Sequence, residues 1–587
     1  MMKSQVALLY VLIIMCGGWA QSLKPRRSVS FSDVNLKLFE ELDFDGLSSL
    51  LVREDIGLLF IGARGKVITL RLDDIAEKTS ETKWTVSSED KSMCQTKGRS
   101  IEECDNYITM MHTQDDGKIL ICGTKAFDPT CTHLMLKGGN VTMEPTTESG
   151  RGKIPFNPEQ KFASMMNGNM LYTAASIDFL GFKEIFQRHG QNPIKTEEKQ
   201  SWLYDPKMIS IHLAEMKKIS ENNEDDNVFL FFTEKAVEER HMLRLSRVAR
   251  VCKSDLGGLR TLQRKWTSFL KAHLDCPFGD KGSQSLVKDI FLQRDESNLM
   301  DNVFYAIFTS NLKLSSSCSQ SAVCTYKLSD IQQVFRGNFL TLSDSGCWVT
   351  YKKAVPKPYP GSCINDEMRN KSVRTSHDIP DSTLMFVKDH PLMEQVVKPI
   401  TGRPLLVRSA TQFSRIVVDK VTSLDGQQHN IMFISNNSGW LQKAVWSGDD
   451  GGRIIEELQL FQDPQPIRFL QLSSRSGQLY SATRTAVAQL SVRDCSRYTS
   501  CADCLTARDP YWLGSSQRPV CCCCWCFKTS PLSKKIIDIH LTVDVAQFLP
   551  CSLTPISPSA GASLVTSLSP VPDTFCSARD LFNTFLH

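Results

Sequence analysis

The hydrophobic residues of this chain are grouped in short runs that are separated by polar turns. A turn is followed by four to six β-prone apolar residues, then by a Gly, Ser or Thr step, and often by a second apolar run. Runs such as VFLFF at residues 228–232 are apolar at every position, which is typical of strands buried on both faces. This unit recurs at residues 57–72, 116–127, 167–181, 227–239, 302–311, 429–445 and 477–492.

The return of this unit predicts a radially repeated sheet protein. Most units start about fifty to seventy-five residues after the previous one, which favours an all-β propeller. The longer interval between residues 302 and 429 requires an insertion or a unit that the pattern does not reveal. Several separate sandwiches are the alternative, but no Pro/Ser-rich linker divides the first 490 residues, so we expect one closed propeller.

Two segments depart from the strand pattern. Residues 259–274 carry apolar side chains near helical spacing, which predicts an amphipathic helix packed beside a blade. Residues 221–227, with the sequence ENNEDDN, are acidic and predict a solvated loop.

The charge and the first residues of the chain indicate an exported protein. The net charge of +4 over 587 residues does not require nucleic acid or an anionic membrane as a partner. An apolar run at residues 6–15 precedes small residues, so we expect residues 1–20 to be a signal peptide. The alternative, a membrane anchor, needs roughly 18 apolar residues. No later segment is long and apolar enough to span a membrane, so we expect a secreted product.

The cysteines and glycosylation motifs agree with an extracellular location. The chain has 21 cysteines, and disulfides persist in oxidising compartments. Three Asn-x-Ser/Thr acceptors are expected to carry glycans, at Asn140, Asn370 and Asn436.

Some of the cysteines bracket loops that a disulfide can close. Two loops are short, and a bridge across each contributes about 2–4 kcal/mol; they lie between Cys94 and Cys104 and between Cys122 and Cys131. Other cysteines lie in or beside predicted strands, and spacing alone does not fix their partners: Cys252, Cys276, Cys324 and Cys363.

Longer stretches of the sequence resemble the sema domain of the semaphorin family. The matching segments are residues 105–131, 155–158, 171–181, 246–258, 265–276, 321–328, 355–363, 389–397 and 416–426. Residues 389–393 and 458–463 are most similar to class 4 semaphorins, and residues 495–511 resemble the start of a plexin–semaphorin–integrin (PSI) knot.

The resemblance implies a seven-bladed β-propeller at residues 30–490, followed by a partial PSI domain at residues 494–511. It also implies plexin-family receptors as partners and dimerisation through the propeller. The implied disulfides are Cys94–Cys104, Cys122–Cys131, Cys252–Cys363 and Cys276–Cys324. Cys318 and Cys347 fall outside this set, and either an extra bridge or two free thiols would fit the sequence, with a slight preference for the bridge.

The resemblance ends abruptly after Tyr511. Class 4 members normally continue through an immunoglobulin-like domain to a membrane span, whereas residues 512–587 are Pro- and Ser-rich and match neither. We therefore expect a truncated, cysteine-rich PSI-like knot and an irregular, disordered tail. Because the segments that reinforce the family dimer are damaged or missing, we expect only a weak homodimer.

The chain contains no complete catalytic, cofactor or metal motif. It lacks a His-Glu-x-x-His helix and a Gly-x-Ser-x-Gly elbow, and residues 62–66 match a phosphate loop only in part. Residues 447–451, SGDDG, resemble the start of a single sialidase aspartate box. The adjacent cysteines 521–524 cannot all point at one tetrahedral metal ion. We therefore expect a binding protein that is no enzyme and holds no cofactor or metal.

Three functional hypotheses follow from these observations. The favoured one is a plexin-binding ligand that acts in cell guidance, migration or communication between immune or neural cells. A receptor-side propeller of the plexin or Met type is the alternative, and an exported propeller hydrolase is the third. For the ligand, the resemblance places receptor contact near Asp178, Phe179 and Leu180. Because the last two are apolar, burial in a blade is the competing interpretation.

Overall fold

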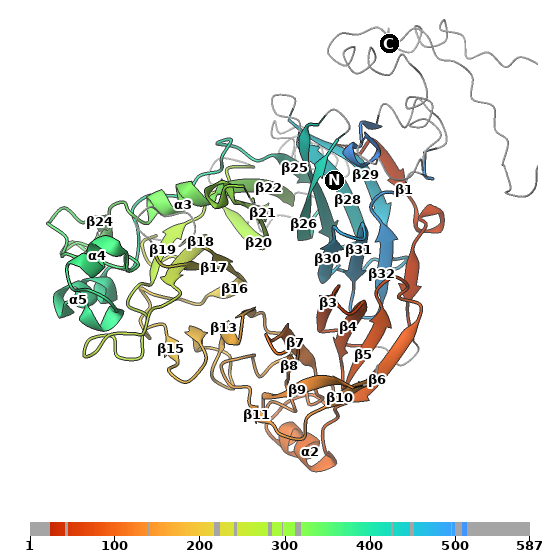
Figure 1. Ribbon diagram of the computed structural model, residues 1–587, viewed down its shortest axis with the longest axis horizontal. Helices are drawn as coiled ribbons and strands as arrows, with labels where there is room; N and C mark the ends of the chain where they lie inside the picture. The colour runs from red at the N-terminus through yellow and green to blue at the C-terminus, as the bar shows by residue number, and fades with distance from the viewer. Residues whose placement is uncertain are drawn as a thin grey trace, which may run out of the picture. The chain divides into compact units, whose positions relative to one another are not determined.

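The apolar runs of the sequence form the strands of radial sheets. The structure is a computed structural model that describes residues 24–41, 45–137, 140–216, 224–239, 243–279, 284–295, 297–310, 319–423, 426–446, 451–494, 496–498 and 507–513. The chain divides into a propeller unit of residues 1–420 and 430–492 and a second unit of residues 421–429 and 493–587. Among the described strands, seven sheets surround a centre (Figure 1), which confirms the predicted seven-bladed propeller.

The first four blades follow the chain without interruption. Blade 1 contains β3 (Ser49–Arg53), β4 (Leu58–Ala63), β5 (Lys66–Arg71) and β6 (Lys78–Lys83). Blade 2 contains β7 (Ile108–Thr113), β8 (Ile119–Gly123), β9 (Thr130–Lys137), β10 (Asn140–Met143) and the short β11 (Glu148–Ser149). Blade 3 contains β12 (Ala163–Asn167), β13 (Met170–Ser176), β14 (Glu184–Arg188) and β15 (Ile194–Lys195). Blade 4 contains β16 (Lys207–Ala214), β17 (Asn227–Lys235), β18 (Arg244–Cys252) and β19 (Leu270–His273).

The last three blades contain an insertion and the ring closure. Blade 5 contains β20 (Ser285–Gln293), β21 (Val303–Ser310), β22 (Gln320–Lys327) and β25 (Leu406–Ser409). Blade 6 contains β26 (Phe413–Thr422), β27 (Gln428–Asn436), β28 (Trp440–Trp446), β29 (Gly452–Gln459) and β1 (Arg27–Val29), which pairs with β29 in parallel. Blade 7 contains β30 (Phe469–Ser473), β31 (Gln478–Ala482), β32 (Val487–Ser491) and β2 (Lys37–Phe39).

The long interval in the strand pattern is an insertion between β22 and β25. It holds the hairpin β23 (Leu340–Leu342) and β24 (Trp348–Thr350) and the helices α3 (Leu328–Val334), α4 (Asp366–Asn370) and α5 (Asp381–Asp389). The other described helices are α2 (Ser88–Thr96), α7 (Pro510–Leu513) and the 3-10 turns η1 (Phe31–Asp33), η2 (Leu299–Asp301) and η4 (Ser376–Asp378).

Strand β17 shows why the apolar runs are continuous. Phe229 and Phe231 pack in a cluster shared with blade 5, whereas Leu230 and Phe232 pack in a cluster shared with blade 3. Both faces of the strand are therefore buried between blades, and full burial of each such side chain contributes about 1.5–3 kcal/mol. A polar residue on either face would leave an unsatisfied group in a blade interface.

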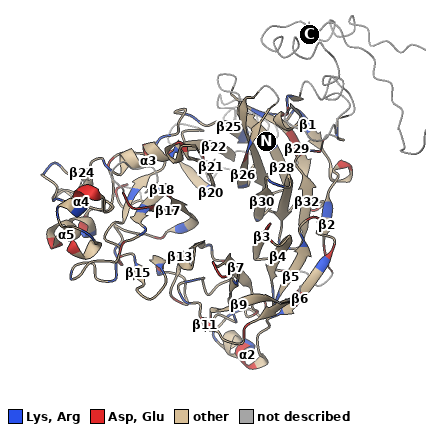
Figure 2. Ribbon diagram, in the orientation of Figure 1, with Lys and Arg blue, Asp and Glu red and all other residues tan. Residues whose placement is uncertain are grey.

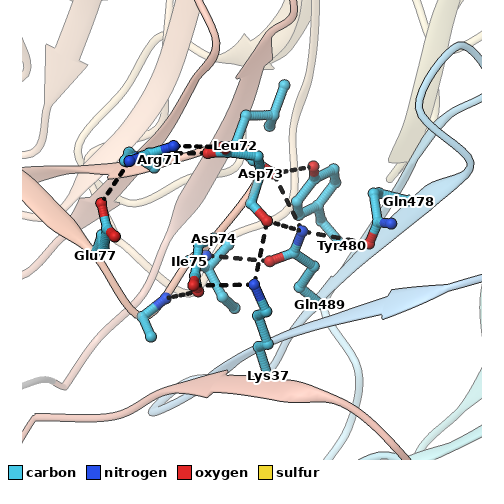
Figure 3. Close-up of polar contacts among 11 residues, drawn as sticks. Lys37, Arg71, Leu72, Asp73, Asp74, Ile75, Glu77, Gln478, Tyr480 and Gln489 are labelled. Atoms are coloured by element: carbon cyan, nitrogen blue, oxygen red, sulfur yellow. Dashed lines mark hydrogen bonds and ion pairs between the residues drawn. The ribbon is translucent and has the colours of Figure 1, made fainter. Parts of the chain in front are cut away.

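The ring closes where the two ends of the propeller unit meet in blade 7. β2 pairs with β32, so a strand near the start of the ring and the last strand of the ring belong to one sheet. Gln489 fixes this blade to blade 1, because its side-chain oxygen accepts from Ile75 N and its nitrogen donates to Leu72 O, both at 3.1 Å (Figure 3). Tyr480 also donates to Leu72 O at 2.5 Å, and Lys37 pairs with Asp74 at 3.0 Å.

The edges of the propeller differ from the expected boundaries of residues 30 and 490. Strand β1 begins at Arg27, and Ser491 still pairs with Gln478. Val492 is buried, and its backbone N donates to Gly477 O at 3.0 Å. A truncation that keeps the propeller must therefore retain Val492.

The helix predicted at residues 259–274 is wrong. These residues form turns and the edge strand β19, and Leu262 and Arg264 have positive φ angles of 56° and 55°, which no α-helix accommodates. The apolar spacing arises because each side chain enters a different contact: the Trp266 indole, for example, donates to Phe186 O at 3.0 Å. The carboxylate of Asp255 accepts from the backbone N atoms of Thr267 and Ser268 at 2.8 and 3.0 Å.

The prediction of a solvated loop at residues 221–227 is also wrong for residues 224–227, the part that the structure describes. Asp225 and Asp226 are buried, and β17 already begins at Asn227. The Asp225 carboxylate accepts from Ser254 N at 2.6 Å, and the Asp226 carboxylate accepts from Met216 N at 2.9 Å. Hydrogen bonds to backbone N–H groups offset the cost of burying these carboxylates, which the charge pattern alone does not show.

The second unit is described only in part. Arg497 pairs with Asp494 at 3.4 Å, and Tyr511 N donates to Asp509 Oδ1 at 3.1 Å. The expected signal peptide, Cys495 and the other knot cysteines, and residues 514–587 of the predicted tail lie outside the described residues.

No helix in the described part of the chain is long and apolar enough to cross a membrane.

Candidate functional site

The turn that joins β13 to β14 carries the predicted contact residues. The backbone carbonyl of Asp178 accepts from Gly181 N at 3.1 Å, and its carboxylate accepts from Lys183 N at 2.6 Å and from Phe182 N at 3.3 Å. Gly181 has a φ of +75°, which a residue without Cβ adopts at little cost. Asp178 therefore holds the turn closed, with its carboxylate engaged by the turn's own backbone.

Phe179 points into a small aromatic cluster beneath the turn. Its ring centroid lies 5.3 Å from that of Phe127 and 6.1 Å from that of Phe156. The guanidinium of Arg99 lies 4.8 Å from the Phe179 centroid and 4.4 Å from the Phe127 centroid, which is the geometry of a cation–π contact. Phe179 is partly buried and supports the turn from below.

The adjacent apolar residues of the turn face solvent. The exposed fractions are 65% for Leu180 and 80% for Phe182, and across the aromatic cluster they are 68% for Ile101 and 58% for Met93. We call these four residues the apolar rim. Phe182 was missed by the sequence analysis, because its exposure depends on the path that the chain takes through Gly181.

Two residues of the apolar rim lie on a disulfide-stapled segment outside the blade strands. Met93 lies on α2, and Ile101 follows it inside the loop closed by Cys94–Cys104. Ser87 begins the helix by accepting from Asp90 N at 3.1 Å. Both cysteines are buried in the same cluster as Phe127. This covalent and aromatic base keeps a nine-residue helix in place beside the turn.

A polar layer connects the turn to the blade interior. The Gln160 side chain donates to Gly181 O at 3.1 Å and to Glu184 Oε1 at 3.0 Å, and it accepts from Ser176 Oγ at 3.2 Å. The other oxygen of Glu184 is buried without a hydrogen-bond partner. Burial, opposed by the Gln160 hydrogen bond, raises the pKa of Glu184 to about 7.

The remaining disulfides staple the blades. Cys122–Cys131 joins β8 to β9, Cys252–Cys363 joins β18 to the insertion, and Cys276–Cys324 joins the segment after β19 to β22. These three and Cys94–Cys104 are the pairs that the resemblance implies. Cys347 is an exposed free thiol, and Cys318 lies outside the described residues.

The expected glycan acceptors differ in their surroundings. Asn370 is exposed at the end of α4, whereas Asn436 is buried, and its Oδ1 accepts from Ser438 N at 2.9 Å and from Trp440 N at 3.0 Å. Asn140 begins β10. Asn370 is therefore better presented to a glycosylating enzyme than Asn436; the Asn140 side chain lies outside what the structure describes.

The part of the chain that the structure describes holds no group of three His, Cys, Asp or Glu side chains arranged to bind a metal ion. The partial phosphate-loop match begins inside a strand: Gly62 lies in β4, where an added Cβ would lie 2.6 Å from Ile108 O. Its glycine therefore serves blade packing. Residues 447–450 and the cysteines 521–524 lie outside the described residues.

The comparisons with known proteins agree with this architecture. Residues 287–474 match the Sema domain. The chain is 40% identical to human Semaphorin-4D over 527 residues, which cover 88% of this chain and 60% of that protein. It is 36% identical to mouse Semaphorin-4C over 511 residues, covering 85% of this chain and 60% of that protein. The chain thus spans about three-fifths of the length of these curated relatives.

Solved structures give the same assignment. A chain in the structure of Drosophila Plexin A in complex with Semaphorin 1b matches with a TM-score of 0.68 and 26% identity, covering 81% of this chain and 90% of that chain. Drosophila Semaphorin 1a matches with a TM-score of 0.69 and 29% identity, covering 83% and 93%. The extracellular region of Plexin A4 shares the fold at 16% identity, with a TM-score of 0.58 and coverage of 81% and 53%. Over most of its length the chain is therefore similar to semaphorins, and the two curated relatives named above are of class 4.

Proposed function

We propose that the chain is an extracellular, non-enzymatic signalling ligand that binds a plexin-family receptor through the apolar rim. The observation that carries this proposal is the exposure of Leu180 and Phe182 above a stapled aromatic base. Exposed apolar side chains gathered on an otherwise polar surface are typical of protein interaction sites. The solved complex of Drosophila Plexin A with Semaphorin 1b supports the receptor class.

The site divides the work of recognition between neighbouring residues. Phe182 and Leu180 would enter apolar pockets of the receptor, and we expect the two anchors together to contribute about 2 kcal/mol or more. Asp178 and Phe179 would act as positioning residues, because one closes the turn and the other packs beneath it. A preformed turn loses little conformational entropy on binding, which favours affinity.

Signalling would follow from geometry rather than from chemistry in the ligand. Two propellers in a weak homodimer would hold two receptors together, because the second contact benefits from a high effective concentration. The finer roles that we propose are guidance, migration or communication between immune or neural cells, with the chain acting as a secreted ligand. Equilibrium sedimentation that shows a tight dimer at nanomolar concentration would contradict the weak-dimer proposal.

The direct experiment is a binding panel with the purified, mature protein. We expect saturable binding to at least one plexin ectodomain, with the mass of the complex measured in solution. Binding to semaphorin ectodomains instead of plexins would support the receptor-side alternative. Turnover of sialosides by the same preparation would support the hydrolase alternative, and absence of binding to every plexin would overturn the proposal.

A further inference from the structure

A pocket of about 500 Å³ is lined by residues from blades 2, 3 and 4. Three of its lining residues are buried: Tyr172 on β13, Arg188 at the end of β14 and Asp225 just before β17. Exposed lining residues include Asp115, between β7 and β8, and Asn169, between β12 and β13. We call this site the blade-3 pocket, with the three buried residues as its floor and the exposed residues as its rim.

The blade-3 pocket is separate from the proposed receptor surface. Strand β13 begins at Met170, which lines the pocket, and ends at Ser176, just before the turn that carries Asp178. The two sites therefore lie at opposite ends of a strand that is about 20 Å long. A function of the pocket goes beyond the proposed binding of a receptor at the apolar rim.

The floor of the pocket contains a buried guanidinium group that has no carboxylate partner. Arg188 is 6% exposed, its guanidinium carbon lies 5.6 Å from the Trp266 ring centroid, and its Nη1 donates to Lys253 O at 2.6 Å. In the part of the chain that the structure describes, no carboxylate lies within ion-pair distance of Arg188. Buried charges are normally paired, because removing an ion from water is costly. An anionic ligand would therefore give this cation the partner that it lacks.

The remaining N–H donors of Arg188 are accessible from the pocket. A guanidinium group has five N–H donors, and the carbonyl of Lys253 accepts from one of them. None of the Arg188 nitrogens is both buried and without a hydrogen-bond partner. Since Arg188 lines the pocket, its other donors face the pocket or the nearby Tyr172 hydroxyl. The planar fork of a guanidinium matches the two oxygens of a carboxylate.

The charges of the lining favour a ligand with a single negative charge. Lys253 also lines the pocket, but its Nζ pairs with Asp226 at 3.1 Å. Asp115 and Asp225 add two carboxylates to the lining. Figure 2 shows Lys and Arg interspersed with Asp and Glu along the ribbon, so the basic character of the floor is local. A doubly charged phosphate would meet repulsion from these acidic groups, whereas one carboxylate needs only Arg188.

The rim offers groups that exchange hydrogen bonds with hydroxyl groups. Asn169 Oδ1 accepts from Asp115 N at 3.2 Å, so the Asn169 amide nitrogen and the Asp115 carboxylate are a donor and an acceptor for a ligand. Ser254, another exposed lining residue, donates its hydroxyl to Asp225 at 2.6 Å and can still accept. The volume of the pocket is that of a small-molecule site. A compact ring with one carboxylate and several hydroxyl groups fits both the floor and the rim.

We propose that the blade-3 pocket binds an acidic sugar, a single sugar unit that bears one carboxylate. The carboxylate would form a bidentate contact with Arg188, and the hydroxyl groups of the ring would bind Asp115 and Asn169 at the rim. The same chemistry is present in uronic acids and in sialic acids, and the test distinguishes these two sources.

The test is titration calorimetry of the full-length mature protein with the methyl glycosides of glucuronic acid and of N-acetylneuraminic acid. We expect saturable one-to-one binding of at least one of them, and the tighter ligand identifies the source. Methyl glucoside, which lacks the carboxylate, should bind at least tenfold more weakly, and sodium acetate should compete with the acidic sugar. The proposal would be overturned if neither acidic sugar bound saturably, or if methyl glucoside bound equally well.

Two variants test the assignment of the floor and the rim. Arg188→Lys keeps the positive charge but removes the fork, so we expect at least a tenfold loss of affinity. Asn169→Asp keeps the acceptor for Asp115 N and adds a negative charge at an exposed position, so we expect at least a threefold loss with an unchanged melting temperature. The control Asn437→Asp makes the same exchange in the exposed turn between β27 and β28 and should bind like the parent.

The rim variant decides the matter if Arg188→Lys lowers the melting temperature. Equal affinities of Asn169→Asp and Asn437→Asp for the acidic sugar would overturn the proposal. The receptor proposal is tested separately, because Leu180→Asp/Phe182→Asp should leave sugar binding unchanged. Loss of sugar binding in that variant, with an unchanged melting temperature, would contradict the placement of the sugar in the blade-3 pocket.

Discussion

The apolar rim and the ring closure in blade 7 are two regions of one propeller that are held in place in opposite ways. The rim consists of side chains on a turn, on α2 and in the loop closed by Cys94–Cys104, all outside the blade strands. The ring closure consists of the pairing of β2 with β32 and of the hydrogen bonds from Gln489 to blade 1, so segments far apart in sequence hold it. Local covalent structure maintains the first region and global topology maintains the second. Mutations can therefore remove the support of the rim without opening the ring.

The largest difference between the two regions should appear when the disulfide beneath the rim is removed. Replacing Cys94 and Cys104 together by serine removes the staple of a short loop, which should cost about 2–3 kcal/mol of local stability. We expect faster hydrogen exchange in α2 and weaker plexin binding, while hydrogen exchange in β32 at the ring closure is unchanged. Equal loss of exchange protection in both regions would show that they are not independent.

A smaller effect is expected from the aromatic support of the turn. Phe179→Ala should destabilise the protein by about 2 kcal/mol, less than a fully buried Phe, because Phe179 is only partly buried against Phe127 and Phe156. The matched variant Leu180→Ala should leave the unfolding free energy almost unchanged, since its side chain is largely exposed. Chemical denaturation measures the unfolding free energy of both variants. A larger loss of unfolding free energy in Leu180→Ala than in Phe179→Ala would show that Leu180, and not Phe179, supports the turn.

The polar layer beneath the turn should respond to pH. The pKa of Glu184 is raised to about 7 in the folded state, so the folded protein binds more protons than the unfolded chain between about pH 4.5 and 7. Stability should therefore fall by about 1–2 kcal/mol as pH rises through this window, after allowance for solvent screening. Glu184→Gln should flatten the profile. The prediction would be contradicted if the stability of the parent rose smoothly through this pH window and if Glu184→Gln left that profile unchanged.

The smallest effect should come from the titration of Lys161. The pKa of Lys161 is lowered in the folded state, so the unfolded chain binds more protons between about pH 8 and 10.5, and stability should rise across this range. Because Lys161 is exposed, solvent screening should limit the gain to below about 1 kcal/mol. Lys161→Gln should abolish the rise, as measured by melting temperature against pH, whereas Lys83→Gln should not.

The sequence predicts the blades because their physics is local. The run at residues 228–232 is apolar at every position, and the structure buries alternate residues against the two neighbouring blades. The same reasoning fails for residues 259–274. Their apolar residues have helical spacing, but Leu262 and Arg264 adopt positive φ angles. Local pattern therefore identifies the strands but does not reveal where tertiary contacts override a helical spacing.

The two regions were predictable to different degrees. The resemblance identified the Asp178–Leu180 region, but the division between Phe179 below and Phe182 above depends on the turn at Gly181. The ring closure was not predictable, because Gln489 contacts Ile75 and Leu72, which lie 414 and 417 positions earlier in the chain. Sites on continuous segments are thus accessible to sequence reasoning, whereas sites assembled by topology are not.

The most direct test of the account is plexin binding by the Leu180→Asp/Phe182→Asp variant. We expect at least a thirtyfold loss of affinity, corresponding to about 2 kcal/mol for buried apolar anchors, with an unchanged melting temperature. The control Met385→Asp places the same charge at another exposed apolar residue, on α5 of the insertion, and should bind like the parent. Unchanged affinity of the double variant for a plexin that the parent binds would contradict the proposal that the apolar rim is the receptor surface.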